Sequence, residues 1–259
     1  MTRQKMAYLS VDDIDFTYPN GHVVFRHLSF QARPGEFVAL LGPSGCGKTT
    51  LLNLLSGFFK PTRGSVSVNG TLIRPETPEL GYVFQSPQLF PWLSAIDNVR
   101  FGLRMARHLN AAEQIERARH YLALVGLEYS AEKLPYQLSG GMQQRVALAR
   151  SLVLEPTLLL MDEPFAALDA ITRNSMNEET LRLWSMLGQT VVFITHDIEE
   201  AVFLADRVVV LGAAPAGIQG ELAIDLPRPR MHRLTRTLPR FHEYANELRD
   251  RIALATQDA

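Results

Sequence analysis

Cysteine is nearly absent from this chain of 259 residues, because Cys46 is the only one. A single cysteine excludes an internal disulfide. Apolar runs of the roughly 20 residues needed to span a bilayer are also missing, and the N-terminus lacks the apolar stretch of a signal peptide. These absences predict a cytoplasmic protein, which would need another polypeptide to form any path through a membrane.

The chain also lacks an excess of charge of either sign, since 26 Lys and Arg against 27 Asp and Glu leave a net charge of −1. Such a balance supplies no overall field to attract nucleic acid or anionic lipid, so we expect no nucleic-acid partner. The chain is nevertheless long enough to bury one large core, with a subdomain or two.

A glycine-rich segment fits the pattern G-x-x-x-x-G-K-[ST]. It follows the apolar run 37–41 and precedes a helical run, which is the strand, loop and helix setting that this pattern requires. Glycines let backbone N–H groups point at phosphates, Lys48 adds a charge for the β- and γ-phosphates, and the Thr49 hydroxyl can complete a Mg²⁺ shell. The residues predicted to hold ATP and Mg²⁺ here are Gly42, Pro43, Ser44, Gly45, Cys46, Gly47, Lys48, Thr49 and Thr50.

Two carboxylates end another apolar run, 157–161, which is typical of a parallel strand covered on both faces. Asp162 is placed to hold Mg²⁺, directly or through water, and Glu163 to orient or deprotonate an attacking water. Adjacent acids usually only solvate the end of a strand. The phosphate-binding pattern upstream favours the catalytic interpretation.

A second segment suited to phosphate follows further along the chain. Ser139, Gly140 and Gly141 precede a continuous run of helix formers at 142–154, so Ser139 is placed near an N-cap and the glycines expose N–H groups to an anion. One nucleotide needs only one such cradle from one chain. We therefore expect two copies of the chain to close around ATP together as a homodimer.

Together, the glycine-rich loop, the acidic strand end and the Ser139 segment resemble the motifs of the ABC ATPase family, and the resemblance covers nearly the whole chain. It implies an α/β P-loop NTPase fold of ABC type, with a parallel-sheet core, an antiparallel β subdomain and a helical subdomain. It also implies ATP hydrolysis and makes residues 139–141 the family's signature segment. Met142 departs from the commonest form, which has Gln there, and we interpret this as tolerated variation.

Single residues acquire roles through this resemblance. Tyr18 matches the aromatic residue that stacks on adenine, with a core strand aromatic as the plainer alternative. Gln85, at the end of a strand predicted at 81–85, matches the glutamine that senses Mg²⁺ and water and opens the loop facing the membrane partner. His196 matches the switch histidine that contacts the γ-phosphate, although a solitary histidine is more often structural. Residues 167–169 resemble the loop that links the two ATP sites across the dimer.

We expect a single ABC ATPase domain over residues 1–259. Its core with the antiparallel layer is predicted at 1–85 and 156–212, the helical subdomain at 86–155 and a C-terminal extension at 213–259. The expected strands are 158–162, 191–195, 207–211 and 218–226, and the expected helices are 95–103, 111–125 and 142–154. Asn69-Gly70 predicts a hairpin turn.

An apolar loop rich in aromatic residues and proline separates Gln85 from the first of those helices. It contains Phe90, Pro91 and Trp92, and although such residues could be core, loops seldom bury so many. We therefore predict that a permease docks near Gln85–Leu93.

The end of the chain changes character after the last predicted strand. Residues 227–230 form an extended basic link. Apolar residues then recur at helical spacing at Phe241, Tyr244, Ala245, Leu248 and Ile252. We expect a terminal helix that packs on its own domain.

The sequence segments 165–173, 195–201 and 225–230 resemble those of the nitrate, sulfonate and taurine branch of importer ATPases. This resemblance implies uptake of a small anionic solute through a separate permease, with a periplasmic or extracellular solute-binding protein, at the cytoplasmic face of the cell membrane. Branches that import pyrimidine thiamine precursors or riboflavin stay open. The remaining alternative is a soluble ABC ATPase acting on nucleic acid or ribosomes. The presence of only one P-loop disfavours a ribosomal ATPase, and the short separation of Lys48 and Asp162 leaves no room for the long coiled coil of a DNA-repair ATPase.

Overall fold

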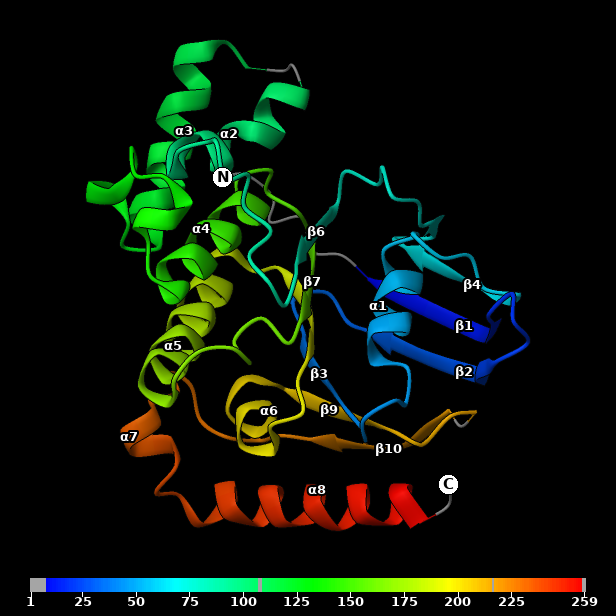
Figure 1. Ribbon diagram of the computed structural model, residues 1–259. Helices are drawn as coiled ribbons and strands as arrows, with labels where there is room; N and C mark the ends of the chain where they lie inside the picture. The colour runs from blue at the N-terminus through cyan, green and yellow to red at the C-terminus, as the bar shows by residue number, and fades with distance from the viewer. Residues whose placement is uncertain (1–7, 107–108, 216, 258–259) are drawn as a thin grey trace.

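Two β-sheets and the helices around them make up the computed structural model, which describes residues 8–106, 109–215 and 217–257 (Figure 1). The strands are β1 (Leu9–Thr17), β2 (Val23–Ala32), β3 (Phe37–Leu41), β4 (Arg63–Val68), β5 (Thr71–Leu72), β6 (Leu80–Val83), β7 (Leu158–Asp162), β8 (Thr190–Ile194), β9 (Arg207–Leu211) and β10 (Ile218–Ala223). The helices are α1 (Lys48–Leu55), α2 (Ala95–Ala106), α3 (Ala111–Leu124), α4 (Gly140–Leu152), α5 (Ala170–Leu187), α6 (Ile198–Leu204), α7 (His232–Thr235) and α8 (Pro239–Gln257), with 3₁₀ turns at Glu128–Ser130 and Pro135–Gln137.

The larger sheet has the strand order β10-β9-β3-β8-β7-β6. Its strands from β9 to β6 run parallel, and β10 pairs antiparallel with β9 at the edge. Strands β3 and β8 are buried along their whole length, which agrees with their continuous apolar sequences. Because parallel strands end at the same edge, the loops after β3, β6, β7 and β8 gather there although they are far apart in the sequence.

The smaller sheet is antiparallel, in the order β2-β1-β4-β5. Its β4–β5 turn has Asn69 at φ 52° and Gly70 at φ 78°, so the predicted Asn-Gly hairpin is confirmed. Helix α1 lies between the two sheets, and its buried leucines join side chains of both sheets in one apolar core (Figure 1). The antiparallel layer beside the phosphate-loop strand was likewise expected.

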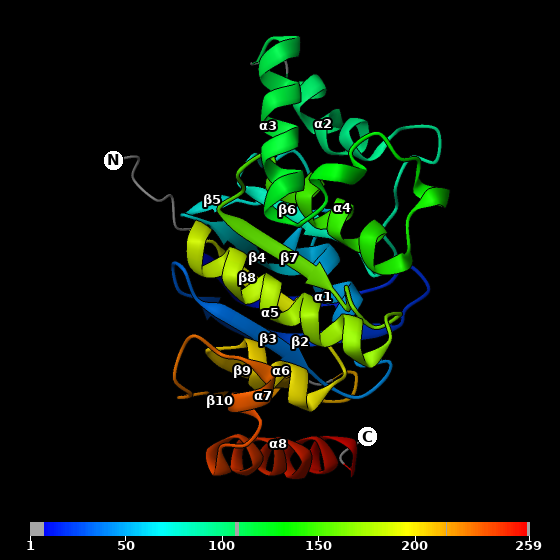
Figure 2. The same cartoon turned by 90° about the vertical axis from the view of Figure 1, so that its left-hand side faces the viewer.

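Helices α2, α3 and α4 pack together at the end of the molecule away from the smaller sheet (Figure 1). Helix α3 begins with a capping box between Asn110 and Glu113. Met142, on α4, is partly buried against the larger core, so an apolar side chain at this position contributes packing. Figure 2 shows α5 lying across the face of the parallel sheet, beside strands β7, β8 and β3.

Several predicted boundaries are wrong by one to three residues. The strand expected to reach Gln85 ends at Val83, which pairs with Met161 of β7, and the carbonyl oxygen of Phe84 accepts a hydrogen bond from Gln144 Nε2 at 3.2 Å instead. The signature helix begins at Gly140 with Ser139 as its N-cap, as expected, but it ends at Leu152 and not at residue 154. The last strand stops at Ala223 and not at residue 226.

The C-terminal helix α8 packs on its own domain, as expected. Phe241, Tyr244, Ala245 and Leu248 are buried, and the helix contacts α6, β9 and β10 (Figure 1). Within the described residues, none of the helices combines the length and the apolar character needed to cross a membrane.

Candidate functional site

The glycine-rich loop connects β3 to α1 in a backbone conformation that side chains disfavour. Gly45 has φ 82° and Gly47 has φ 94°, both in the left-handed region. A Cβ on Gly47 would also lie 2.4 Å from Val24 Cγ1. Helix α1 begins directly after Gly47. The N–H groups of its first turn have no partner within the helix, and the positive end of the helix dipole lies at the loop, so both are available to an anion.

The Lys48 side chain lies inside this loop and bonds to its backbone. Its side chain is buried, with 9% of the residue exposed. Its Nζ donates to the carbonyl oxygens of Gly42 at 2.9 Å and Pro43 at 3.0 Å, and it lies 3.9 Å from Cys46 Sγ. Burial raises the pKa of the Cys46 thiol, so this cysteine fills the loop as a neutral group. The carbonyl oxygens of the loop therefore hold the ammonium group, and among the described residues no carboxylate forms an ion pair with it.

Asp162 ends strand β7 opposite the start of α1. Burial raises the pKa of Asp162, and the nearby charge of Glu163 acts in the same direction, while the Thr49 hydroxyl and the Lys48 charge oppose both. The two predicted metal-binding side chains, Thr49 and Asp162, therefore lie near each other although they come from separate elements.

Glu163 and His196 are also joined, across strands β7 and β8. Glu163 Oε2 lies 2.9 Å from His196 Nδ1, and the backbone N–H of Glu163 donates to Ile194 O at 3.0 Å. Glu163 has φ 41°, an unusual value for a residue with a side chain. Such backbone strain persists where the surroundings impose it, commonly at active sites.

The segment after the acidic pair is held by Arg173, a residue for which the sequence suggested no role. Its guanidinium donates to the carbonyl oxygens of Phe165 at 3.3 Å and Leu168 at 2.8 Å. It also lies 3.7 Å from a carboxylate oxygen of Asp197, beside His196. One arginine on α5 therefore braces both the turn after Glu163 and the turn that carries the histidine.

The signature segment lies at the start of α4, on the helical side of the molecule. Ser139 Oγ accepts a hydrogen bond from the N–H of Met142 at 3.3 Å, which is the N-cap predicted from the sequence. Within the described residues, no hydrogen bond joins this segment to the glycine-rich loop of the same chain. The structure therefore does not place Ser139, Gly140 and Gly141 in the cluster formed by Lys48, Thr49, Asp162, Glu163 and His196.

Gly141 allows α4 to approach α5 closely, and this contact can be tested. A Cβ at Gly141 would lie 2.7 Å from Thr172 Cγ2. We expect Gly141→Ala to lower the free energy of unfolding by about 1–3 kcal/mol through overpacking, and the melting temperature with it, although alanine is the better helix former. Thr172→Ser keeps the hydroxyl that bonds Asp169 and removes the methyl group, so it should restore the melting temperature in the double variant. A melting temperature of Gly141→Ala equal to or above that of the parent would contradict this contact.

Tyr18 and Gln85 flank the cluster. Tyr18 is half-buried, its hydroxyl lies 2.8 Å from Thr50 Oγ1, and its ring packs edge-on against Phe16 and Phe59. It thus stands at the end of β1, next to the helix that follows the phosphate loop. Gln85 is exposed just past β6, at the same edge of the sheet.

The loop after Gln85 presents an exposed aromatic side chain on a rigid support. Trp92 is 73% exposed, and its ring centroid lies 5.7 Å from that of Phe90. Fully buried Asn98 holds the loop, because its amide exchanges hydrogen bonds with the backbone of Phe90 at 2.8 and 3.2 Å and donates to Leu93 O at 3.0 Å. Arg150 adds bonds to the carbonyl oxygens at 87 and 88. Neither anchor was predicted, since their partners are backbone atoms that no sequence pattern marks.

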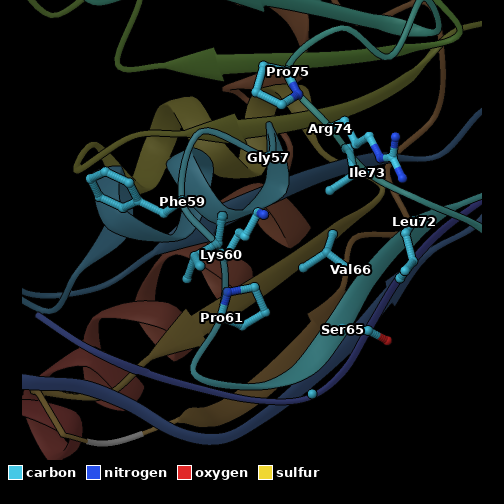
Figure 3. A pocket seen from close by; sticks show the side chains of 12 residues that line it. Gly57, Phe59, Lys60, Pro61, Ser65, Val66, Leu72, Ile73, Arg74 and Pro75 are labelled. Atoms are coloured by element: carbon cyan, nitrogen blue, oxygen red, sulfur yellow. The ribbon is translucent and has the colours of Figure 1, made fainter.

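A cavity of about 390 Å³ lies elsewhere, between the loop after α1 and the β4–β5 hairpin (Figure 3). Phe59, Val66, Leu72 and Ile73 give it an apolar lining, with Lys60 and Arg74 among the surrounding side chains. None of the predicted site residues lines it. This cavity is therefore separate from the cluster around Lys48.

The fold and the cluster define a P-loop ATPase. A comparison with protein-family models matches the ABC transporter family over residues 25–166. The chain belongs to this family and is an ABC-type ATPase that uses ATP.

Relatives and solved structures agree. The chain is 45% identical over 249 residues to the nitrate import ATP-binding protein NrtD of Synechococcus elongatus, covering 94% of this chain and 91% of that one. It is 49% identical over 226 residues to the taurine import ATP-binding protein TauB of Pseudomonas aeruginosa, covering 86% of each chain. A dimeric ATP-binding cassette, MJ0796, solved with ADP and Pi, matches with a TM-score of 0.75 and 32% identity over 85% of this chain and 100% of that chain.

Proposed function

We propose that this protein is the ATP-hydrolysing subunit of an importer for a small anionic solute of the nitrate, sulfonate or taurine type. The observation that carries the ATPase chemistry is the contact of Glu163 with His196 beside the Lys48 loop, at one edge of the parallel sheet. The solute class is supported by the relatives named for nitrate and taurine import. The solute itself would be selected by a permease and a solute-binding protein.

In the proposed site, each group acts at a stated place on the nucleotide. Lys48 and the loop N–H groups, from Gly42 to Thr50, would bind the phosphates. Tyr18 would stack on the adenine. Ser139, Gly140 and Gly141 of a second copy would complete the site from the other side, which is supported by the dimeric state of the matching cassette. This arrangement accounts for a signature segment that, among the described residues, makes no hydrogen bond with its own chain's loop.

The donor set fits Mg²⁺ bound together with ATP. Among the residues that the structure describes, no group of three or more His, Cys, Asp and Glu could hold a metal ion by itself. Mg²⁺ in nucleotide sites usually takes only one or two carboxylates, with phosphate and water oxygens as the other ligands. Thr49 and Asp162, which lie near each other, and Gln85 would hold it. The ion would neutralise the charge on the phosphates when bound.

Hydrolysis would depend on Glu163 and His196. Glu163 would accept the proton of the attacking water, and His196 would hold the carboxylate in place through Nδ1 while its other ring nitrogen faces the γ-phosphate. The peptide N–H of Glu163, bonded to Ile194 O, fixes the backbone from which this side chain projects.

The permease would dock at the loop Gln85–Leu93 on the membrane-facing side, with the dimer bound peripherally at the cytoplasmic face of the cell membrane. We expect Trp92→Ala to weaken co-purification with the permease at least about tenfold, because exposed aromatic residues often provide the main interface energy, while ATP binding stays unchanged. Tyr129→Ala removes another exposed aromatic residue, far from this loop in sequence, and serves as the control. Unchanged recovery of the permease with Trp92→Ala would refute the docking site.

The proposal as a whole is tested by purifying the tagged chain from detergent-solubilised membranes and identifying what accompanies it. A multi-spanning permease in the eluate, with ATP hydrolysis that rises when the solute-binding protein and its solute are added, is the expected result. Recovery with ribosomes or nucleic acid instead would keep the ATPase chemistry and overturn the transport role.

A further inference from the structure

Arg230, in the basic link within the C-terminal extension, is buried among backbone carbonyl groups. Only 4% of the residue is exposed. Burial lowers its pKa to about 10, so it remains positively charged at neutral pH. Its guanidinium donates to the carbonyl oxygens of Ala205 at 2.8 Å, Phe203 at 3.0 Å, Val202 at 3.3 Å, and Ile224 and Leu226 at 3.4 Å each.

Three of these acceptors belong to the last turn of α6 and the residue that caps it. The carbonyl end of a helix is its negative pole and leaves acceptors without intrahelical partners. A buried cation that donates to them both satisfies these groups and complements the dipole. Arg230 therefore holds α6 by its C-terminal end.

The other end of α6 carries the histidine of the site. Asp197, directly after His196, is the N-cap and accepts from the N–H groups of Glu199 at 2.9 Å and Glu200 at 3.2 Å. The buried Glu200 side chain is bonded to the Thr195 hydroxyl on the other side of His196. Because α6 is a short, internally bonded unit, a shift of its C-terminal end carries His196 with it.

The C-terminal extension contacts α6 at further points. The His232 ring stacks on Phe203 with centroids 3.8 Å apart. Arg236 and Arg249 lie 3.4 and 3.7 Å from the carboxylate of Glu199, in the first turn of α6. Contacts from the extension therefore reach both ends of this helix.

We infer that Arg230 is a positioning residue for ATP hydrolysis, which fixes α6 and thereby sets where His196 stands against Glu163. The C-terminal extension then has a task in the reaction besides covering the core. The inference rests on the role proposed for His196.

A double-variant cycle on the full-length chain tests it, with ATP hydrolysis measured as a function of ATP concentration for the parent, Arg230→Met, His196→Ala and the combination. We expect Arg230→Met to lower kcat roughly tenfold with KM for ATP within about twofold, since small displacements of catalytic groups cost rate more than binding. In the His196→Ala background the same change should lower kcat less than about twofold, because the residue it positions is gone. Arg230→Lys, which keeps the charge, should recover most of the rate.

Arg240→Met is the matched control, because the side chain of Arg240, on α8, is exposed and pairs with Glu243. It should hydrolyse ATP like the parent. Should Arg230→Met fail to fold, Arg236→Gln removes a surface contact to the first turn of α6 and should lower kcat about two- to threefold, again only when His196 is present.

Equal losses of kcat in both backgrounds, or a lower melting temperature with unchanged kcat, would overturn the positioning role of Arg230 and leave the proposed function standing. Parent-like hydrolysis by His196→Ala would overturn the proposed role of His196 and this inference with it.

Discussion

Glu163→Gln is expected to bind ATP as the parent does and to accumulate as a closed dimer, with hydrolysis lowered at least about 100-fold. The amide keeps the shape of the side chain and can still bond His196, which lies 2.9 Å from the carboxylate. It cannot accept the proton of the attacking water. Size-exclusion chromatography with ATP, together with phosphate release, measures both consequences.

Glu132→Gln is the control for this variant, since Glu132 is an exposed acid that pairs only with Arg119 among the described side chains. It should hydrolyse ATP normally and show no ATP-dependent trapping of the dimer. A Glu163→Gln protein that turns over at the parent rate would remove Glu163 from its assigned role.

Lys48→Ala should lose nucleotide affinity by about 100-fold or more, because a charge-assisted contact to phosphate is worth a few kcal/mol. Loss of its bonds to Gly42 and Pro43 would also loosen the loop that supplies the N–H groups. Calorimetric titration with ATP and Mg²⁺ measures the effect. Lys60→Ala removes an exposed lysine beside the separate cavity and should bind ATP as the parent does.

Normal ATP binding by Lys48→Ala would contradict the phosphate contact. The two substitutions separate the steps, since one is expected to abolish turnover on a bound nucleotide and the other to abolish binding. If both variants lost binding, the cluster would have to act as a single structural unit, and the division of roles would be wrong.

Much of the fold follows from local patterns in the sequence. Strands β3, β7 and β8 are buried on both faces and are continuously apolar, so their sequences mark them as parallel core strands. The Asn69-Gly70 turn and the Ser139 cap depend on the backbone preferences of one or two neighbouring residues, which makes them equally predictable. The terminal helix was expected from the spacing of its buried apolar residues.

Predictions failed where a distant side chain takes a backbone group. The strand that begins at Leu80 stops at Val83, and Gln144, on α4, donates to the next carbonyl oxygen, that of Phe84. Arg173, Asn98 and Arg230 brace functional segments in the same way, through carbonyl oxygens. Every residue except proline offers the same backbone donor and acceptor, so a sequence does not show which of them a remote arginine or amide will reach.

The sequence by itself determined the chemistry of this protein: a loop that can cradle phosphate, a lysine and a hydroxyl beside it, two carboxylates at a strand end, and a second cradle that calls for another copy. Only the tertiary structure decided that Glu163 bonds His196, that Thr49 lies near Asp162 and that Arg230 donates to the carbonyl end of the helix that follows the histidine. The physical reason is that motif chemistry and helix or strand preference act between neighbours in the chain. Contacts between strand ends depend instead on strand order, which is set by the packing of the whole core.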